Sequence, residues 1–219
     1  MPRPRLGWIL SFAFLVPLAL SVPRSRAEQL STEQWREDLR FVVDSLREIH
    51  PKPFLRTTEG AFSAEVADLS AALPDLDDDQ VVMRLMRLVA SIGDGHTALI
   101  PGGPQPVRHA YPLRLHRFQD GVYVVSIDAD LAHLAGGRVV RIGDVAIEDA
   151  VARVEAVSSG DSEFGKRWPA SLLFTVPRVV HALGITASPL EMSLAVATPD
   201  GLSTEATLAA VEPEEPFQS

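Results

Sequence analysis

The spacing of the hydrophobic residues changes near Thr97, and this change divides the chain into two kinds of structure. Before Thr97, apolar side chains recur at the three- to four-residue spacing of a helix face. After it, short apolar runs alternate with polar residues and are separated by glycine and proline, a pattern typical of β-strands. The sequence therefore predicts an α+β fold, with a helical front followed by a strand-rich back.

Three helices are expected in the front part. Ser31 opens the first with a capping box that Gln34 completes. The second begins near Thr58 and stops at Pro74, and the third opens at Asp77–Asp79. The residues expected to face the core are Trp35, Leu39, Val42, Leu46 and Ile49 in the first helix, Phe62, Val66, Leu69 and Leu73 in the second, and Val81, Val82, Leu85, Leu88, Val89 and Ile92 in the third.

The back part is expected to contain five strands and two helices. Between the two helices, the polar segment 158–169 is interpreted as a loop. Pro177 is expected to interrupt or restart the second helix. The predicted strands are Tyr111–Phe118, Val122–Ile127, Arg138–Ile142, Leu190–Ala197 and Leu202–Val211, and the predicted helices are Ile147–Val157 and Ser171–Leu183.

The acidic run Asp77–Asp79 has two interpretations. It could belong to a calcium-binding loop, but the glycine and the distal glutamate that such loops need do not follow it. Carboxylates are also favoured at the N-terminus of a helix, where unpaired N–H groups carry partial positive charge. The second interpretation fits the sequence better.

The first 27 residues are typical of a secretory signal peptide. Basic Arg3 and Arg5 precede an apolar run at 7–22, and the small residues Ser25 and Ala27 form an A-x-A-like cleavage site. A membrane anchor is the alternative, but the run is short for a span of about 20 residues and contains a proline. We therefore expect export to the periplasm or the extracellular space, with no stable membrane span after cleavage.

Charge and cysteine content exclude several function classes. Removing residues 1–27, which contain four arginines and no acid, would change the net charge from −9 to −13. Such an acidic chain repels phosphate backbones, so nucleic acid is not an expected partner. The absence of cysteine rules out disulfides, thiol catalysis and a lipid-modified cysteine. The six histidines show no metal-ligand spacing, so no metal and no cofactor is expected.

His96 is the residue with the strongest claim to chemistry. It follows Gly93-Asp94-Gly95 directly after a helix, and glycine permits a sharp turn that could present an imidazole to a cleft. The alternative is an ordinary turn at a helix C-terminus. Residues 160–162 read Gly-Asp-Ser, but glutamate follows where an oxyanion hole needs glycine, so the segment is interpreted as a loop.

Four short motifs, in order, resemble the tail-specific, or C-terminal processing, serine proteases on their tricorn-like side. The matching segments are Trp35-x-x-Asp38-Leu39 with Ile49-His50-Pro51-x-Pro53-Phe54, then Leu88-Val89-Ala90-x-Ile92-Gly93-Asp94-Gly95-His96-Thr97, then Tyr111-Pro112-Leu113 with Phe118-x-Asp120-Gly121-Val122-Tyr123-Val124, and finally Gly137-x-Val139-Val140-x-Ile142-Gly143 followed by Val145. The last segment resembles the peptide-binding, PDZ-like module of such proteases.

The resemblance implies roles for particular residues. His96 matches the position of a general base for a catalytic serine, with Gly93, Asp94 and Gly95 forming the supporting turn. The strand Arg138, Val139, Val140, Arg141 and Ile142 would bind a peptide by strand addition. The family's nucleophile lies in a core that follows the PDZ-like region, whereas this sequence ends at Ser219. A truncated or split protease, inactive alone, is therefore expected.

The resulting domain organisation has four parts: a signal peptide at 1–27, a helical domain at 28–100, a PDZ-like α+β region at 101–211 and an acidic, proline-rich tail at 212–219. The expected partners are peptides or unfolded protein C-termini, together with a separate catalytic-core chain. Two alternatives stay open: a stand-alone peptide-binding module, and an interaction partner for another protein of the cell envelope.

Overall fold

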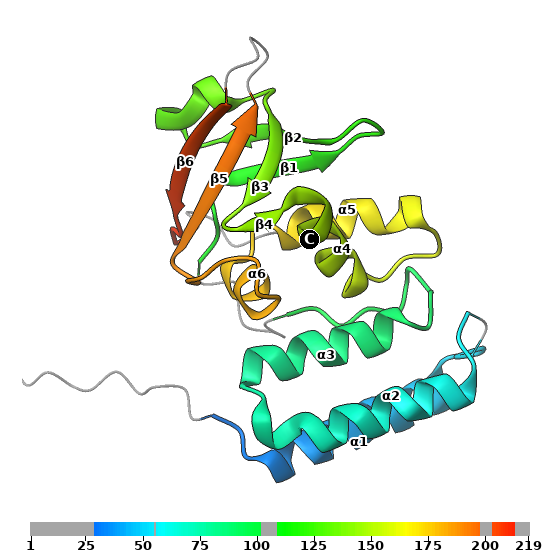
Figure 1. Ribbon diagram of the computed structural model, residues 1–219. Coiled ribbons are helices and arrows are strands. Elements are labelled where there is room, and N and C mark those ends of the chain that lie inside the picture. Colours follow the sequence, from blue (N-terminus) through cyan, green and yellow to red (C-terminus); the bar gives the residue numbers. More distant parts are fainter. Residues whose placement is uncertain (1–28, 55, 102–108, 198–202, 213–219) are drawn as a thin grey trace, which may run out of the picture.

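The computed structural model describes residues 29–54, 56–101, 109–197 and 203–212 (Figure 1). Two sequence-based expectations lie outside these residues. The signal peptide at 1–27 lies wholly outside them, and the acidic, proline-rich tail at 212–219 lies outside them apart from its first residue. Within the described ranges, no helix combines the length and the apolar character that crossing a membrane requires.

The three predicted front helices are confirmed as α1 (Thr32–Ile49), α2 (Glu59–Ala72) and α3 (Asp78–Ala90), with the short 3-10 helix η1 (Leu73–Asp75) after α2. A complete capping box starts α1. Ile49 differs from the prediction, because it lies at the end of α1 and its side chain is 78% exposed. The buried residues shared by these helices are Leu39, Val43, Phe62, Leu69, Leu73, Val81, Leu85, Leu88 and Ile92.

Each aspartate of the acidic run has a structural partner. The Asp77 carboxylate caps α3 by accepting from the Gln80 N–H at 2.8 Å. Asp78 accepts from the indole N–H of Trp35 in α1, also at 2.8 Å. Asp79 pairs with Arg178, whose Nε donates to it at 2.9 Å. Helix capping and tertiary contacts therefore account for this run.

The strand-rich part contains one antiparallel sheet, which together with the helices confirms the α+β fold. Its order is β1-β2-β3-β5-β6, with β4 beside β3. Ala110, before β1, and Val211, after β6, exchange backbone hydrogen bonds of 2.8 and 2.9 Å, so the two edges of the sheet approach each other at one end. The strands are β1 (Leu113–Arg117), β2 (Val122–Ile127), β3 (Arg138–Ile142), β4 (Val145–Ala146), β5 (Glu191–Ala197) and β6 (Ser203–Ala209).

The helices of this part differ from the sequence interpretation in one respect. Segment 158–169, expected to be a loop, contains most of α5 (Glu163–Leu173). Ser162 caps this helix by accepting from the Gly165 N–H at 3.1 Å, and the chain stays helical through Pro169. Pro177 then starts α6 (Pro177–Ala182) as its first residue, so a restart rather than a continuous helix is confirmed. The other helices are α4 (Ile147–Ala156) and the 3-10 helix η2 (Ala129–Leu134).

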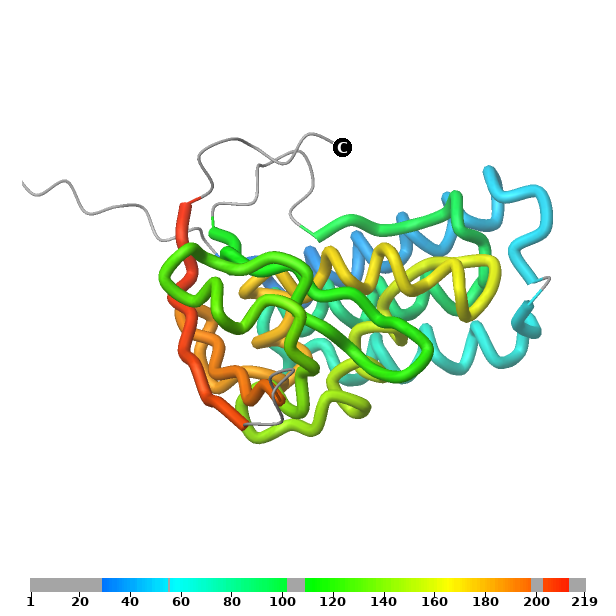
Figure 2. The backbone as a smooth tube through the Cα atoms, turned by 90° about the horizontal axis from the view of Figure 1, so that it is seen from above, coloured from blue at the N-terminus to red at the C-terminus, as the bar shows by residue number. Residues whose placement is uncertain are grey.

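The core consists of three apolar clusters, one of which joins the two parts. One lies among the front helices and a second lies between the sheet and helices α4 and α5. A third joins them, with Met83 and Met86 of α3 packed against Val157, Val176 and Val179. Figures 1 and 2 show β5 and β6 toward one end of the helical layer, whereas the α1–α2 connection projects at the other. The whole arrangement is consistent with a PDZ-like module packed on a helical front.

Candidate functional site

The Gly-Asp-Gly-His turn follows α3 and presents His96 to solvent. Gly93 has φ +73°, a left-handed conformation that glycine adopts without the steric penalty of a Cβ. The His96 side chain is 94% exposed. The backbone of the turn is nevertheless fixed, because both Asp94 and residues distant in the sequence bind it.

Asp94 is the centre of this fixed turn. Its carboxylate accepts from the backbone N–H of His96 at 2.9 Å, from the Thr97 hydroxyl at 2.8 Å and from Nε2 of His50 at 2.9 Å. Hydrogen bonds favour the charged form of a carboxyl group. These hydrogen bonds therefore lower the pKa of Asp94 from 3.8 to about 2. The bond from the backbone N–H of His96 has the largest effect, and the bonds from the side chains of Thr97 and His50 come next. The carboxylate stays charged throughout the physiological range.

The hydrogen bonds of His50 define its tautomer. Its Nδ1 lies 3.1 Å from the backbone N–H of Lys52, which can only donate. Nδ1 is therefore the acceptor, and the proton resides on Nε2, which donates to Asp94. His50 thus donates to Asp94 and connects the end of α1 to the His96 turn.

A second carboxylate binds the turn from the strand-rich part. Asp161, in the loop before α5, accepts from the backbone N–H of Gly95 at 2.7 Å. Arg56 contributes a further contact, because its Nη2 donates to the Asp161 carbonyl at 3.3 Å. Sequence analysis did not assign a role to Asp161 or Arg56. The only sequence signal was the pair of glycines flanking Asp94, which permits close approach without identifying the approaching residue.

The described residues provide a candidate base but no nucleophile for it. No hydrogen bond among them joins the imidazole of His96 to a hydroxyl group. Nδ1 of His96 lies 3.7 Å from Asp94, beyond hydrogen-bonding distance. The hydroxyl of Ser162, in the Gly-Asp-Ser segment, caps α5. That segment is therefore structural, as the sequence indicated.

The predicted peptide-binding strand, Arg138–Ile142, is β3, and its position argues against strand addition there. On one side β3 pairs with β5 along its length, and on the other it pairs with β2 at Arg138 and with β4 at Arg141 and Ile142. An interior strand has no free row of N–H and C=O groups to offer a peptide. Of the five predicted residues, Val140 lies at a register shift in the pairing with β5. The other four, Arg138, Val139, Arg141 and Ile142, have strand partners that a peptide would have to displace.

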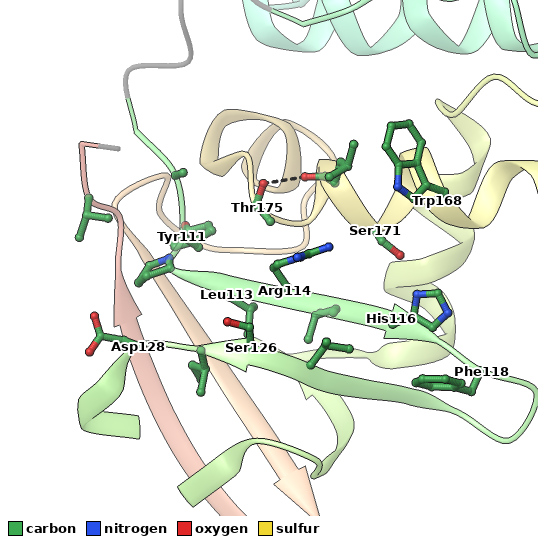
Figure 3. A pocket seen from close by; sticks show the side chains of 17 residues that line it. Tyr111, Leu113, Arg114, His116, Phe118, Ser126, Asp128, Trp168, Ser171 and Thr175 are labelled. Atoms are coloured by element: carbon green, nitrogen blue, oxygen red, sulfur yellow. Dashed lines mark hydrogen bonds between the residues drawn. The ribbon is translucent and has the colours of Figure 1, made fainter. Parts of the chain in front are cut away.

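A groove of about 880 Å³ lies instead along β1, between the β1–β2 hairpin and α5 (Figure 3). Among the described strands, β2 is the only one that pairs with β1. At one end of the groove the Tyr111 N–H donates to the Thr175 carbonyl at 2.9 Å, which joins the residue before β1 to the segment after α5. The labelled lining residues are Tyr111, Leu113, Arg114, His116, Phe118, Ser126, Asp128, Trp168, Ser171 and Thr175.

The groove combines exposed apolar surface with one cationic side chain. Trp168 of α5 is 69% exposed, and Phe118 and Val125 of the hairpin are 49% and 52% exposed. Arg114 extends from β1 into the space between the strand and the helix (Figure 3). A concave site of this volume, lined by apolar side chains with a few polar groups, is typical of binding pockets. His96 is not among the residues that line this groove.

Within the ranges that the structure describes, no group of three or more His, Cys, Asp or Glu side chains is placed to hold a metal ion.

Comparison with known proteins supports a relationship at the level of the fold. No family model matches the sequence, and no curated protein is similar enough to count as a match. Among solved structures, mature CPAF in complex with lactacystin matches with a TM-score of 0.54 and 14% identity over 82% of this chain and 35% of CPAF. A serine-to-alanine mutant of CPAF matches with a TM-score of 0.56 and 13% identity over 83% of this chain and 34% of the mutant chain.

CPAF is a chlamydial serine protease that resembles the tail-specific proteases. The chain spans about a third of the length of these solved structures. At such low sequence identity the likeness concerns the fold alone. The chain thus shares the fold of part of a serine protease distantly related to the tail-specific family.

Proposed function

We propose that this chain is the base-bearing, substrate-handling part of a serine peptidase related to the tricorn-like branch of the tail-specific proteases. The observation that carries the proposal is the exposed imidazole of His96 on a turn whose backbone is fixed by Asp94 and Asp161. A general base needs both access to its partner and a defined orientation. The fold likeness to CPAF supports the same class of reaction.

The nucleophile would come from a catalytic core outside these 219 residues, either on a separate chain or further along the same polypeptide. His96 would accept the proton of the core's serine hydroxyl as its oxygen attacks the peptide carbonyl, and would then return it to the departing amine. The core would also supply donors for the oxyanion. Without them, the chain alone is expected to be inactive toward proteins.

The test begins with the DNA beyond codon 219, translated in all forward frames, and continues with the purified proteins. We expect the 219-residue chain alone to leave an unfolded protein substrate intact. If a core with a nucleophilic serine is encoded there, co-expressing it should produce cleavage that His96→Ala abolishes. Cleavage by the chain alone, or unchanged cleavage by the His96→Ala variant with the core present, would contradict the proposal.

Peptide capture is a second candidate function, and the groove along β1 is the observation that favours it. An extended peptide lying beside β1 would place apolar side chains against Trp168 and Phe118 and its C-terminal carboxylate near Arg114. Binding by the chain alone would make it a stand-alone peptide-binding module. It would also be compatible with a protease that captures unfolded C-termini before cleavage.

Fluorescence anisotropy with labelled peptides tests this second function. A peptide with an apolar C-terminal residue and a free carboxylate should bind about tenfold more tightly than the same peptide with an amidated end, since a charge-assisted contact is lost. Arg114→Ala should remove that difference, whereas Arg84→Ala, an exposed position on α3, should preserve it. Absence of enrichment in a random C-terminal library would refute peptide capture.

Export is proposed from the sequence of residues 1–27. Cleavage after Ala27 would give a mature chain beginning at Glu28. N-terminal sequencing of the native protein, recovered from cell-envelope and culture fractions, tests this directly. A native protein that begins at Met1, or that is recovered only from the cytoplasm, would contradict export. Co-purification from the same fractions would identify a catalytic-core chain or another envelope partner.

A further inference from the structure

Three segments that are far apart in the sequence meet around the His96 turn. They are the residues after α1, represented by Arg56, the turn at 93–97 itself, and the loop at 158–162 before α5. Glycines allow this approach. A Cβ on Gly93 would lie 2.6 Å from Cγ of Arg56, and a Cβ on Gly95 would lie 3.2 Å from Oδ2 of Asp161.

Two successive backbone amides of the turn donate to carboxylates of different origin. The Gly95 N–H donates to Asp161 at 2.7 Å, and the His96 N–H donates to Asp94 at 2.9 Å. Hydrogen bonds to charged acceptors are shorter and stronger than those between neutral groups. The peptide planes on both sides of the Gly95 Cα are therefore held, one from outside the turn and one from within it.

Asp161 itself is held in place. Arg56 lays its methylene groups over Gly93 and donates from Nη2 to the Asp161 carbonyl at 3.3 Å. Directly after Asp161, Ser162 caps α5, the helix that also forms one wall of the groove. The carboxylate is thus fixed relative to the strand-rich part, and through the Gly95 amide it fixes the turn to that same part.

We propose that Asp161 is a positioning residue for His96. Its carboxylate sets the direction in which the imidazole leaves the backbone, relative to the module that carries the groove. This inference rests on the proposed function, because positioning matters only if His96 serves as a base. The contact itself can be tested in the chain alone, so the two proposals can fail separately.

The first measurement needs no variant. In the ¹⁵N,¹³C-labelled chain, a scalar coupling across the hydrogen bond is expected between the Gly95 amide nitrogen and the side-chain carboxyl carbon of Asp161. The second measurement is amide hydrogen exchange at residues 93–97. Asp161→Ala should accelerate exchange at Gly95 about tenfold, since the charge-assisted bond of this amide is lost. Exchange at His96, whose amide keeps its bond to Asp94, should accelerate to a smaller extent as the turn loosens. The same variant should also lower the backbone order parameter of His96.

Two further variants serve as controls. Asp161→Asn retains an oxygen that can accept from Gly95, so its exchange should be intermediate between the parent chain and Asp161→Ala. Glu163→Gln removes a neighbouring carboxylate that takes no part in the turn and should leave residues 93–97 unchanged. Exchange at buried Leu88 should be the same in all variants, which separates a local effect from general destabilisation.

An absent coupling, or exchange and order at His96 that Asp161→Ala leaves at parental values, would overturn the positioning role. In an active assembly with a catalytic core, Asp161→Ala should lower kcat with little effect on KM. If the contact is found but His96→Ala leaves cleavage unchanged, the proposed function fails although the contact is real.

Discussion

Replacing Gly93 by alanine tests the local geometry that presents His96. A left-handed backbone conformation costs a residue with a Cβ about 1–2 kcal/mol. The added Cβ would also lie 2.6 and 2.8 Å from Cγ and Cβ of Arg56. The arginine side chain would have to leave the turn and give up its hydrogen bond to Asp161, at a cost of about 1 kcal/mol.

A change in the unfolded state offsets part of this loss of stability. Alanine has fewer accessible backbone conformations than glycine when unfolded, which favours folding by about 0.4–1 kcal/mol. The net effect of Gly93→Ala should therefore be a destabilisation of about 2 kcal/mol, or a fall in Tm of roughly 4–8 °C for a chain of this size.

Gly60→Ala is the matched control, because it makes the same chemical change in a different environment. Gly60 lies in α2, and a Cβ there would meet no atom within 4 Å. Since alanine is the better helix former, this variant should gain up to about 1 kcal/mol. Thermal and urea unfolding followed by circular dichroism would measure both variants. Equal midpoints for Gly93→Ala and the parent chain would refute the close packing of Arg56 over the turn.

Three further predictions concern individual side chains. The pKa of Asp94 is lowered to about 2, so its carboxylate stabilises the fold above about pH 4, and this contribution is lost as the pH falls through 2. Asp94→Asn should therefore flatten that part of the acid unfolding profile, measured by circular dichroism. Burial raises the pKa of Tyr111, and a hydrogen bond to a carboxylate raises the pKa of Tyr123. Because these are the only two tyrosines in the sequence, ultraviolet titration of the folded chain should give a midpoint above pH 10. Unfolding in guanidinium should lower this midpoint. A folded-state midpoint at or below pH 10 would contradict both the burial of Tyr111 and the hydrogen bond of Tyr123. Trp35→Phe removes the indole donor to Asp78 and should lower the free energy of unfolding by about 1 kcal/mol, measured by urea unfolding; a variant as stable as the parent would show that the bond contributes nothing.

The front helices could be predicted from the sequence because their signals are local. Capping residues such as Ser31 and Asp77, the helical spacing of apolar side chains and the terminating prolines all act within a few residues. The same applies to the hairpin between β1 and β2 and to the restart at Pro177. The Ile49 prediction failed because periodicity identifies a helix face without showing where the neighbouring elements end.

The first part of helix α5, Glu163–Pro169, was missed because its residues give conflicting local signals. Gly165 and Pro169 both disfavour a helix interior, and the side chains of Phe164 and Trp168 remain exposed. Packing of Ala170 and Phe174 against the sheet stabilises the helix despite these residues. Tertiary burial therefore outweighed local propensity.

For the candidate site, the sequence alone identified His96 as the candidate base and the two glycines that let its turn form. Only the tertiary structure placed His50 and Asp161 on that turn, because they lie 44 and 66 residues from the groups they bind, Asp94 and Gly95. Sheet order likewise assigned Arg138–Ile142 to an interior strand and the groove to β1. Local sequence specifies turns and helix ends through short-range hydrogen bonds, whereas the partners of a surface carboxylate or a strand edge depend on how distant segments pack.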